Sequence, residues 1–376
     1  MKKKILIAPN SYKECADSVS AANYFAQELN ELNAVENILL PLSDGGDGFL
    51  NVCSKYYKLE ILEYEISTPY NETTFSCKVG YDREKGVIFI ESANVLGMKI
   101  IPQEKRHPMY LSSKGMGELL HGIMKDHENN KVMVKKIIIG IGGTGTNDLG
   151  LGLLESFGLR LKGEGGRILK VIPANYEIAS EIIWSNQILP FEIELVSDVD
   201  NPLLGDDGST MVFGKQKGLS NEELISAENG FCNIVNLLKY HNIVELPNAL
   251  PGSGGGLSAG LKLFFNAKLK SSKIFLSEIL KSINIKDIDL IITGEGAFDN
   301  QSFNQKATGF LIDIYQKCKK PIIVCCGTYN ENISGNLPEN VFVIELKKYF
   351  KNESDSIKYF RKGIHFAVNE IAERFI

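Results

Sequence analysis

Short apolar runs that end in glycine- or aspartate-rich turns recur along this chain, and segments with helical periodicity follow them. The runs cover residues 4–8, 38–42, 137–141, 290–296, 321–327 and 341–344. An uninterrupted apolar run is typical of a parallel strand that is buried on both faces. Strand, turn and helix repeated in this order predict an α/β fold with parallel sheets. We expect an amphipathic helix over residues 354–376 to close the chain.

The region between residues 60 and 93 follows a different pattern. Apolar and polar residues alternate in the segments 62–66, 75–79 and 87–90, and no long helix separates them. Such alternation is typical of antiparallel strands with one solvated face. We therefore predict two domains. A Rossmann-like parallel α/β domain comes from both chain ends, residues 1–67 plus 255–376, and a mixed α/β domain, residues 68–254, is inserted into it.

The composition narrows the classes of function. The chain has 376 residues, 44% hydrophobic and 23% charged, with a net charge of −5, which is typical of a globular protein. No apolar run approaches the roughly 20 residues of a membrane helix, and no long basic run predicts nucleic-acid binding. Seven scattered cysteines without a C-x-x-C pair favour reduced thiols and a cytoplasmic location. The five histidines lack the spacing of zinc ligands.

Polar and charged residues directly follow the apolar runs. Ligands of open α/β sheets bind outside the carboxyl ends of the strands, so we expect these residues near a ligand. They are Asn10, Ser11, Lys13, Asp44, Asp47, Thr144, Thr146, Asn147, Asp148, Asp198, Asp200, Asn201, Glu295 and Asp299. Clustered carboxylates with few histidines suit Mg²⁺, whereas glycine amides with Lys13, Lys217 and Lys306 suit phosphate oxygens. Together they predict a phosphate-handling α/β enzyme that catalyses phosphoryl transfer.

Simpler explanations exist for single members of this set. For Asp17 and Asp148, capping of a helix N-terminus would be a sufficient explanation. Residues 140–145 match the G-x-G-x-x-G dinucleotide fingerprint, but only Glu164 stands near the position of the ribose-binding acid. We therefore interpret this loop as a backbone cradle for an anion. A dinucleotide-dependent dehydrogenase is the weakest alternative, and the Walker pattern is absent from the sequence.

The same residues fall in blocks that resemble the type I glycerate kinase family, as a somewhat divergent member. The resemblance runs from residue 4 to about residue 330. The blocks are residues 7–14 (IAPNSYKE), 44–48 (DGGDG), 115–119 (GMGEL), 140–148 (GIGGTGTND), 198–203 (DVDNPL), 212–218 (VFGKQKG), 251–256 (PGSGGG) and 292–296 (ITGEG), followed by Asp299 and Lys306. Each block alone is modest evidence for the family, but all of them in this order over this length form a very specific pattern.

The resemblance implies ATP-dependent, Mg²⁺-assisted phosphorylation of D-glycerate to 2-phosphoglycerate, with the active site in a cleft between two α/β domains. The catalytic positions that it implies are Lys13, Asp44, Asp198, Asp299 and Lys306. The substrate- or nucleotide-binding positions are Ser11, Gly45, Gly46, Thr146, Asn147, Asn201, Gln216, Lys217, Gly294, Glu295 and Gly296. The partner is thus a small molecule, with neither nucleic acid nor membrane involved.

Roles can be assigned to these residues as hypotheses. Asp198 would act as the base or orienter of the attacking hydroxyl, with Asp44 as a neighbour that raises its pKa. Asp299 would hold Mg²⁺ or order the loop that contains Glu295, and Asp198 is the second predicted metal ligand. Lys13 and Lys306 would balance the phosphate charge, or one of them would hold the glycerate carboxylate.

Several residues depart from the family pattern. Asn10 stands where the family usually has Asp, and Phe49, Met116 and Leu149 are bulkier than usual; Gln305 replaces a glycine. A larger side chain at the edge of a pocket changes substrate preference. One alternative is therefore a kinase for another small hydroxy acid or polyol. Another is a non-catalytic paralogue that binds a ligand, although the retained carboxylates and lysines argue against it.

Overall fold

The computed structural model describes residues 2–247, 249–281, 284–300, 302, 306–330, 332 and 337–376. Contacts divide the chain into two units. Unit 1 is Met1–Tyr56 with Ser271–Ile376, and unit 2 is Tyr57–Lys270. The sequence placed these boundaries near residues 67 and 255. They differ because the strand Glu60–Ser67 pairs along its length with a strand of unit 2, and Leu257 and Leu261 belong to the core of unit 2.

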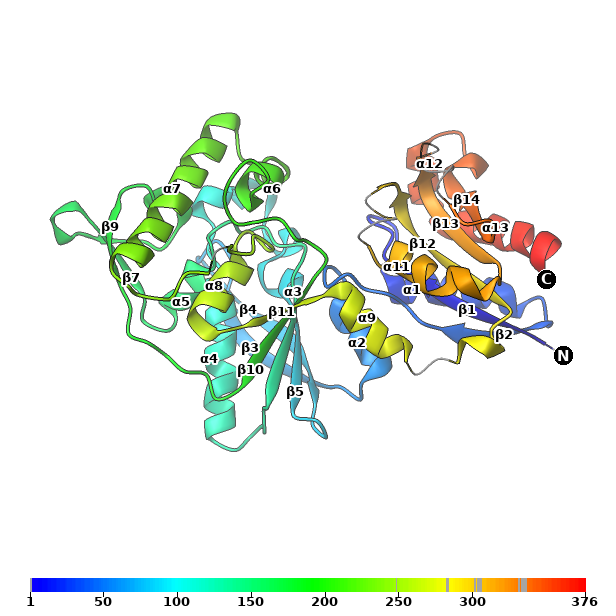
Figure 1. Ribbon diagram of the computed structural model, residues 1–376, viewed down its shortest axis with the longest axis horizontal. Coiled ribbons are helices and arrows are strands. Elements are labelled where there is room, and N and C mark those ends of the chain that lie inside the picture. Colours follow the sequence, from blue (N-terminus) through cyan, green and yellow to red (C-terminus); the bar gives the residue numbers. More distant parts are fainter. Residues whose placement is uncertain are drawn as a thin grey trace. The chain divides into compact units, whose positions relative to one another are not determined.

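Unit 1 contains a parallel sheet in the order β14-β13-β12-β1-β2 among the described strands (Figure 1). Its strands are β1 (Lys3–Pro9), β2 (Val35–Leu39), β12 (Leu290–Phe298), β13 (Ile322–Tyr329) and β14 (Val341–Glu345). All four neighbouring pairs are parallel. The strand order reverses between β1 and β12, and a reversal of this kind creates a crevice at the carboxyl ends of the two strands.

Helices cover both faces of this sheet, as its apolar strands require. The helices of unit 1 are α1 (Ser18–Asn30), α2 (Phe49–Tyr56), α9 (Ser272–Leu280), α11 (Ala307–Tyr315), α12 (Glu353–Lys358) and α13 (Phe360–Phe375). Alternate strand residues such as Ile5 and Ile292 pack against Phe25 of α1 and Ile364 of α13. Leu6 and Ile291, which alternate with them, are also fully buried, and α11 contacts β12 and β13.

Unit 2 is built on a mixed sheet in the order β11-β10-β6-β5-β4-β3. The strands are β3 (Glu60–Ser67), β4 (Thr74–Asp82), β5 (Val87–Glu91), β6 (Lys136–Gly140), β10 (Glu192–Ser197) and β11 (Lys268–Ser271). The pairs β10–β6 and β6–β5 are parallel, whereas β3–β4 and β4–β5 are antiparallel. The predicted change from parallel to antiparallel pairing in the middle of the chain is therefore confirmed.

Smaller elements surround the sheet of unit 2. A second sheet has the order β8-β7-β9, with β7 at Arg160–Gly163, β8 at Ile168–Leu169 and β9 at Ala179–Ile183. The helices are α3 (Ser92–Leu96), α4 (Lys114–Glu128), α5 (Leu151–Glu155), α6 (Ser209–Lys217), α7 (Asn221–Tyr240) and α8 (Leu257–Phe265). In the part of the chain that the structure describes, no helix is long and apolar enough to cross a membrane.

Two predicted elements differ in detail from the structure. The expected strand at 38–42 is β2, Val35–Leu39, because Pro41 has no N–H group with which to continue the ladder. The chain still runs beside β1, since the N–H groups of Leu40 and Leu42 donate to the Ile7 and Pro9 carbonyls. The expected terminal helix is divided into α12 and α13 by Tyr359, whose ψ of 30° lies outside the helical range.

Candidate active site

The first group of predicted site residues lies at the strand reversal of unit 1. Asn10 and Ser11 directly follow β1, while Gly294, Glu295 and Gly296 are the fifth to seventh residues of β12. The N–H of Asn10 donates to the Gly294 carbonyl at 2.8 Å, which joins the ends of the two strands. The site therefore stands where an α/β sheet of this order binds its ligand.

Asp44 is held by hydrogen bonds from two other segments of unit 1, the end of β1 and the start of α11. Asn10 Nδ2 donates to Asp44 Oδ2 at 2.6 Å, and the N–H of Ala307, the first residue of α11, donates to Asp44 Oδ1 at 3.0 Å. Burial raises the pKa of Asp44, although Asn10, Ala307, Lys306 and Lys13 all favour the charged form. The structure thus combines a desolvated carboxylate with the positive end of a helix.

Glu295 and Lys306 form an ion pair beside Asp44 in which Glu295 is buried and Lys306 is partly exposed. Lys306 Nζ lies 3.0 Å from Glu295 Oε2 and donates to Ser302 Oγ at 3.1 Å. Burial raises the pKa of Glu295, and Asp44 raises it further. Burial lowers the pKa of Lys306, but the charge and hydrogen bond of Glu295 raise it by more, so that the pKa of Lys306 lies above its ordinary value. The lysine is therefore held protonated between carboxylates.

One carboxylate oxygen of Glu295 makes no hydrogen bond to the described residues. Glu295 Oε1 is buried and has no hydrogen-bond partner among the described residues, and the same is true of Thr308 Oγ1. The Thr308 hydroxyl is near enough to stabilise the Glu295 carboxylate, although the two atoms do not meet hydrogen-bond geometry. A buried oxygen without a partner costs free energy, so this position is suited to a ligand donor or a cation.

The remaining predicted residues of unit 1 surround this cluster. Asp299 Oδ1 accepts a hydrogen bond from the Ser302 N–H at 2.9 Å, and Lys13 is exposed but favours the charged form of Asp44. Gly45 has a φ of +94°, and Gly46 accepts a hydrogen bond from Phe49 as α2 begins. These residues shape the loops that present the charged groups.

The second group of predicted residues lies in unit 2, where two glycine-rich loops meet. Lys217, the last residue of α6, is only 8% exposed. Its Nζ donates to the Thr146 carbonyl at 2.6 Å and to Thr144 Oγ1 at 3.4 Å. Burial lowers the pKa of Lys217 to about 8, against an opposing effect of Asp148. A Cβ atom at Gly255 would lie 2.9 Å from Lys217 Nζ, so glycine lets the second loop approach the ammonium group.

Asn147 and Thr146 complete this cluster. Asn147 Nδ2 donates to Thr210 Oγ1 at 3.0 Å. Asn147 Oδ1 and Thr146 Oγ1 are buried and have no partner among the described residues. The same holds for the hydroxyls of Ser209, which precedes Thr210 in the chain, and Ser253, two residues before Gly255. Several polar atoms in one place thus have unused hydrogen-bonding capacity.

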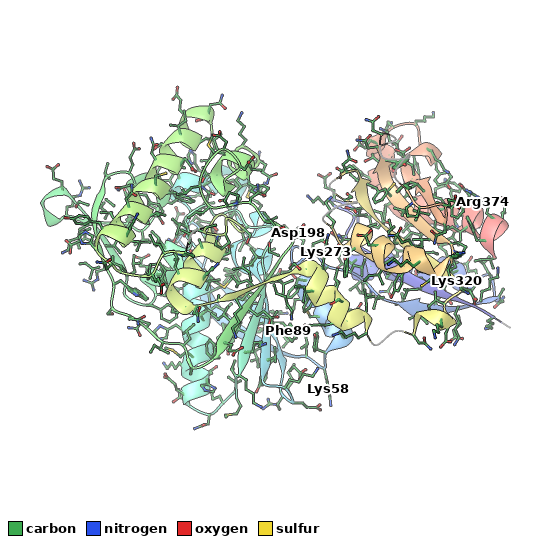
Figure 2. The ribbon with its side chains drawn as sticks, viewed as in Figure 1. Lys58, Phe89, Asp198, Lys273, Lys320 and Arg374 are labelled. Carbon is green, nitrogen blue, oxygen red and sulfur yellow. The ribbon has the colours of Figure 1, made fainter. Side chains whose placement is uncertain are left out.

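Three further predicted residues of unit 2 are less buried. Asp198 directly follows β10 (Figure 2) and is partly exposed. Asn201 Nδ2 donates to the Asp207 carbonyl at 2.8 Å, which orders the loop before α6. Gln216 is exposed, and its side chain makes no hydrogen bond to the described residues. The predicted pairing of Asp44 with Asp198 joins residues of different units and stays a prediction, as does a metal site formed by Asp198 and Asp299.

Asp148 belongs to the framework of the unit 2 loops. Its carboxylate accepts hydrogen bonds from the N–H groups of Ser113 at 2.6 Å, Gly150 at 3.2 Å and Gly152 at 3.3 Å. The sequence placed Asn10 among the residues expected near a ligand and Gly255 in a glycine-rich block, but assigned neither of them a role in the site. Thr210 was not among the candidates, and nothing local in the sequence distinguishes it.

The bulky departures from the family pattern lie in the hydrophobic interior. Phe49, Met116 and Leu149 are fully buried. Phe49 packs against Phe275 with ring centroids 5.4 Å apart, and the other two belong to the core of unit 2. The expectation that they reshape a pocket edge is therefore wrong for these three residues. Gln305 lies outside the described residues.

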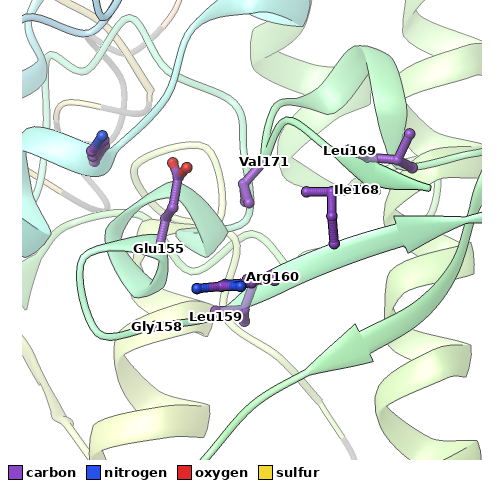
Figure 3. Close-up of a pocket in the computed structure, with 8 residues that line it drawn as sticks. Glu155, Gly158, Leu159, Arg160, Ile168, Leu169 and Val171 are labelled. Atoms are coloured by element: carbon purple, nitrogen blue, oxygen red, sulfur yellow. The ribbon is translucent and has the colours of Figure 1, made fainter. Parts of the chain in front are cut away.

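A pocket of about 350 Å³ occurs elsewhere in unit 2 (Figure 3). Lys114, Glu155 and Arg160 line it together with apolar side chains from the β7–β8 region, including Leu159 and Ile168. Burial raises the pKa of Glu155, while Lys114 opposes this effect. None of the predicted site residues lines this pocket.

The donor set of the site is suited to a hard cation and to anionic substrates. Among the described residues, no three His, Cys, Asp or Glu side chains gather at one place. A magnesium ion needs only one or two carboxylates, with substrate oxygens and water as its other ligands, and the unpartnered Glu295 Oε1 shows that oxygen donors are present. A parallel α/β fold with buried charged and polar side chains at the ends of its strands is typical of enzymes that bind small anionic substrates.

Comparisons with known proteins identify the family. The sequence model of the glycerate kinase family matches residues 5–375. The glycerate 2-kinase of Escherichia coli K12 is 29% identical over 338 residues, which is 88% of this chain and 86% of that protein. The glycerate kinase of Halalkalibacterium halodurans is also 29% identical over 338 residues, covering 87% of this chain and 86% of the relative.

A solved structure agrees with these relatives. A protein from Salmonella typhimurium LT2, assigned as glycerate kinase 2, superimposes with a TM-score of 0.75 at 28% identity, covering 99% of this chain and 97% of that one. The chain belongs to the glycerate kinase family and is an enzyme of the kinase class. The expected α/β fold with parallel sheets is confirmed by the same likeness.

Proposed function

We propose that this protein transfers the γ-phosphoryl group of ATP to the 2-hydroxyl of D-glycerate, with Mg²⁺ present, and releases 2-phosphoglycerate. The family match over residues 5–375 carries the proposal, because it spans both units and all charged residues of the site. The relative from Escherichia coli is named a glycerate 2-kinase, which supports the 2-position.

The charged cluster of unit 1 has the properties that phosphoryl transfer requires. Positioning and neutralisation of charge do most of the catalysis in this reaction. Lys306, held protonated by Glu295, and the exposed Lys13 would bind phosphate oxygens. Asp44, tied to Asn10 and to the start of α11, would keep these cations in place.

Asp198 would orient the substrate hydroxyl and accept its proton. A carboxylate at the end of a strand can do this without its own backbone moving. Asp198 and Asp299 would also hold Mg²⁺, which when bound neutralises the charge of the phosphate groups. The free thiols of all seven cysteines support a cytoplasmic location for this activity.

D-Glycerate is preferred here over another hydroxy acid or a polyol as the acceptor. The alternative rested on Phe49, Met116 and Leu149, and all three pack in the interior. The decisive experiment measures ADP release with ATP, Mg²⁺ and D-glycerate, with phosphorus NMR of the product. A panel of hydroxy acids and polyols is run beside it. Turnover with D-glycerate to the 3-phosphate would contradict the 2-position, and turnover only with another acceptor would contradict the substrate.

Substitution of Asp198 tests its role as the proton acceptor. We expect Asp198→Asn to retain its fold and to lose at least about a hundredfold in kcat, in the usual range for general-base catalysis. Asp200→Asn is the matched control, since Asp200 is exposed and two residues further along the same loop. Near-normal turnover by Asp198→Asn would remove Asp198 from this role.

A further inference from the structure

The buried lysine of unit 2 lacks a counterion. Lys217 Nζ donates only to a carbonyl and a hydroxyl, and no carboxylate of the described residues lies within ion-pair distance. Asp148 interacts with Lys217 electrostatically, but its carboxylate oxygens accept hydrogen bonds from backbone N–H groups. The donors are Ser113, Gly150 and Gly152. A buried charge without a partner is costly. The position is therefore suited to an anion that arrives with a ligand.

The polar atoms around Lys217 are also incomplete. Thr146 Oγ1 and Asn147 Oδ1 lack partners, although Thr146 is fully buried and Asn147 is 1% exposed. The backbone of both residues lies beside the ammonium group, because a Cβ atom at Gly255 would meet the Thr146 carbonyl, the Asn147 Cα and Lys217 Nζ. The residues that bear the unpartnered donor and acceptor are thus neighbours of the cation.

The mixture of donors and acceptors distinguishes between possible anions. Lys217 and the Thr146 hydroxyl can donate to a carboxylate or to a phosphate. Asn147 Oδ1 can only accept, and a fully charged phosphate group has no hydrogen to donate to it. A hydroxy acid carries a carboxylate and a hydroxyl together, so it satisfies all three groups.

We propose that Lys217, Thr146 and Asn147 form the acceptor-binding site in unit 2, where Lys217 holds the carboxylate of D-glycerate and Asn147 Oδ1 accepts a hydrogen bond from a substrate hydroxyl. This assignment rests on the proposed function and adds to it the unit, and the residues, that select a hydroxy acid. It also leaves Lys13 and Lys306 of unit 1 for the phosphate groups.

The test compares Lys217→Met and Thr146→Val with the wild-type enzyme and with Lys215→Met. Lys215 is exposed on the same helix, so its variant controls for loss of a positive charge. Steady-state kinetics gives KM for D-glycerate and for ATP separately, and calorimetry gives the Kd for D-glycerate without nucleotide. We expect both site variants to raise KM and Kd for D-glycerate at least tenfold, with KM for ATP within twofold of wild type and Lys215→Met unchanged.

The Thr146→Val variant separates binding from structure. Valine has nearly the shape of threonine, so a hydroxyl with no ligand could be removed without loss. An unchanged KM for D-glycerate in both variants of an active enzyme would overturn the assignment, and would leave the unpartnered atoms to buried water. A raised KM for ATP alone would overturn it in favour of the nucleotide phosphates. Failure of the proposed function shows itself separately, as absence of glycerate turnover by the wild-type enzyme.

Discussion

At the scale of the residue, the site contains charges that the fold stabilises poorly on its own. Lys217 illustrates this best, since burial lowers its pKa to about 8 from an ordinary value of 10.5. A group whose pKa is lowered in the folded state binds more protons when the chain unfolds. Stability therefore rises as the pH increases from about 8 to about 10.5.

This lysine yields a prediction about stability. We expect Lys217→Met to raise the free energy of unfolding at pH 7 by about 2 kcal/mol, because relief of desolvation exceeds the loss of the hydrogen bonds to the Thr146 carbonyl and the Thr144 hydroxyl. The gain should shrink toward zero as the pH approaches 10. Chemical denaturation of the ligand-free protein at pH 7 and pH 10 measures it. A variant less stable than wild type at pH 7 would contradict the prediction.

Asn10 gives a second prediction at this scale. Its amide donates to Asp44 at 2.6 Å, so Asn10→Asp would place two carboxylates at hydrogen-bond distance and raise the pKa of the pair. A raised pKa in the folded state lowers stability progressively as the pH rises from the unfolded-state pKa to the folded-state pKa, and the full cost applies above the latter. We expect a loss of about 1–3 kcal/mol at pH 8 that narrows at pH 5. Equal losses at both pH values would argue for a packing defect instead.

At the scale of the element, β12 can lie beside β13 as it does only because residue 294 is a glycine, whereas the second glycine, Gly296, has more space around it. A Cβ atom at Gly294 would collide with the Cys325 carbonyl of β13 and with the Tyr12 hydroxyl, whereas at Gly296 the nearest atom would be 3.4 Å away. The strand therefore tolerates a side chain at one position and not at the other, and this contrast is testable.

We expect Gly294→Ala to lower the free energy of unfolding by about 3 kcal/mol or more, since the clash involves backbone that cannot move freely. Gly296→Ala, on the same strand, should cost less than about 1 kcal/mol of the free energy of unfolding. Urea denaturation of both variants measures the difference. Similar stabilities for the two would show that β13 moves aside.

At the scale of the whole molecule, unit 2 is one continuous stretch of chain with a hydrophobic core of its own. That core joins the sheet, α4, α5 and α8 through residues such as Val79, Leu119, Leu153 and Leu257. Unit 1, in contrast, comes from two segments separated by the whole of unit 2. A single continuous segment of chain with its own hydrophobic core is typical of a domain that folds alone.

A fragment of residues 57–270 is therefore expected to fold without unit 1. It should unfold cooperatively in urea, monitored by circular dichroism, and should have no kinase activity because it lacks Asp44, Glu295 and Lys306. The control is the intact chain, whose unfolding is measured in the same buffer at the same temperature. A fragment without a cooperative transition would show that the core of unit 2 depends on unit 1.

Local sequence determined much of this protein. Apolar runs that continue for five or more residues must be buried on both faces, so β1, β6, β12 and β13 could be predicted from the chain alone. The rule that ligands bind at the carboxyl ends of strands then selected Asp44 and Glu295 as candidates, and the resemblance to the family added Lys217. The order of the sequence blocks along the chain was enough to identify the family.

Only the tertiary structure decided which of these groups act on one another. Asn10 contacts Asp44, and Lys306 pairs with Glu295, across separations in the chain of 34 and 11 residues. The burial of Lys217 and of Phe49, Met116 and Leu149 depends on segments that meet only after folding. Periodicity reports which face of an element is buried, whereas pKa values and unpartnered atoms depend on what packs against that face. For this reason the sequence supplied candidates for the site, and the folded structure showed which of them contact one another and which of the bulky residues beside them pack in the core.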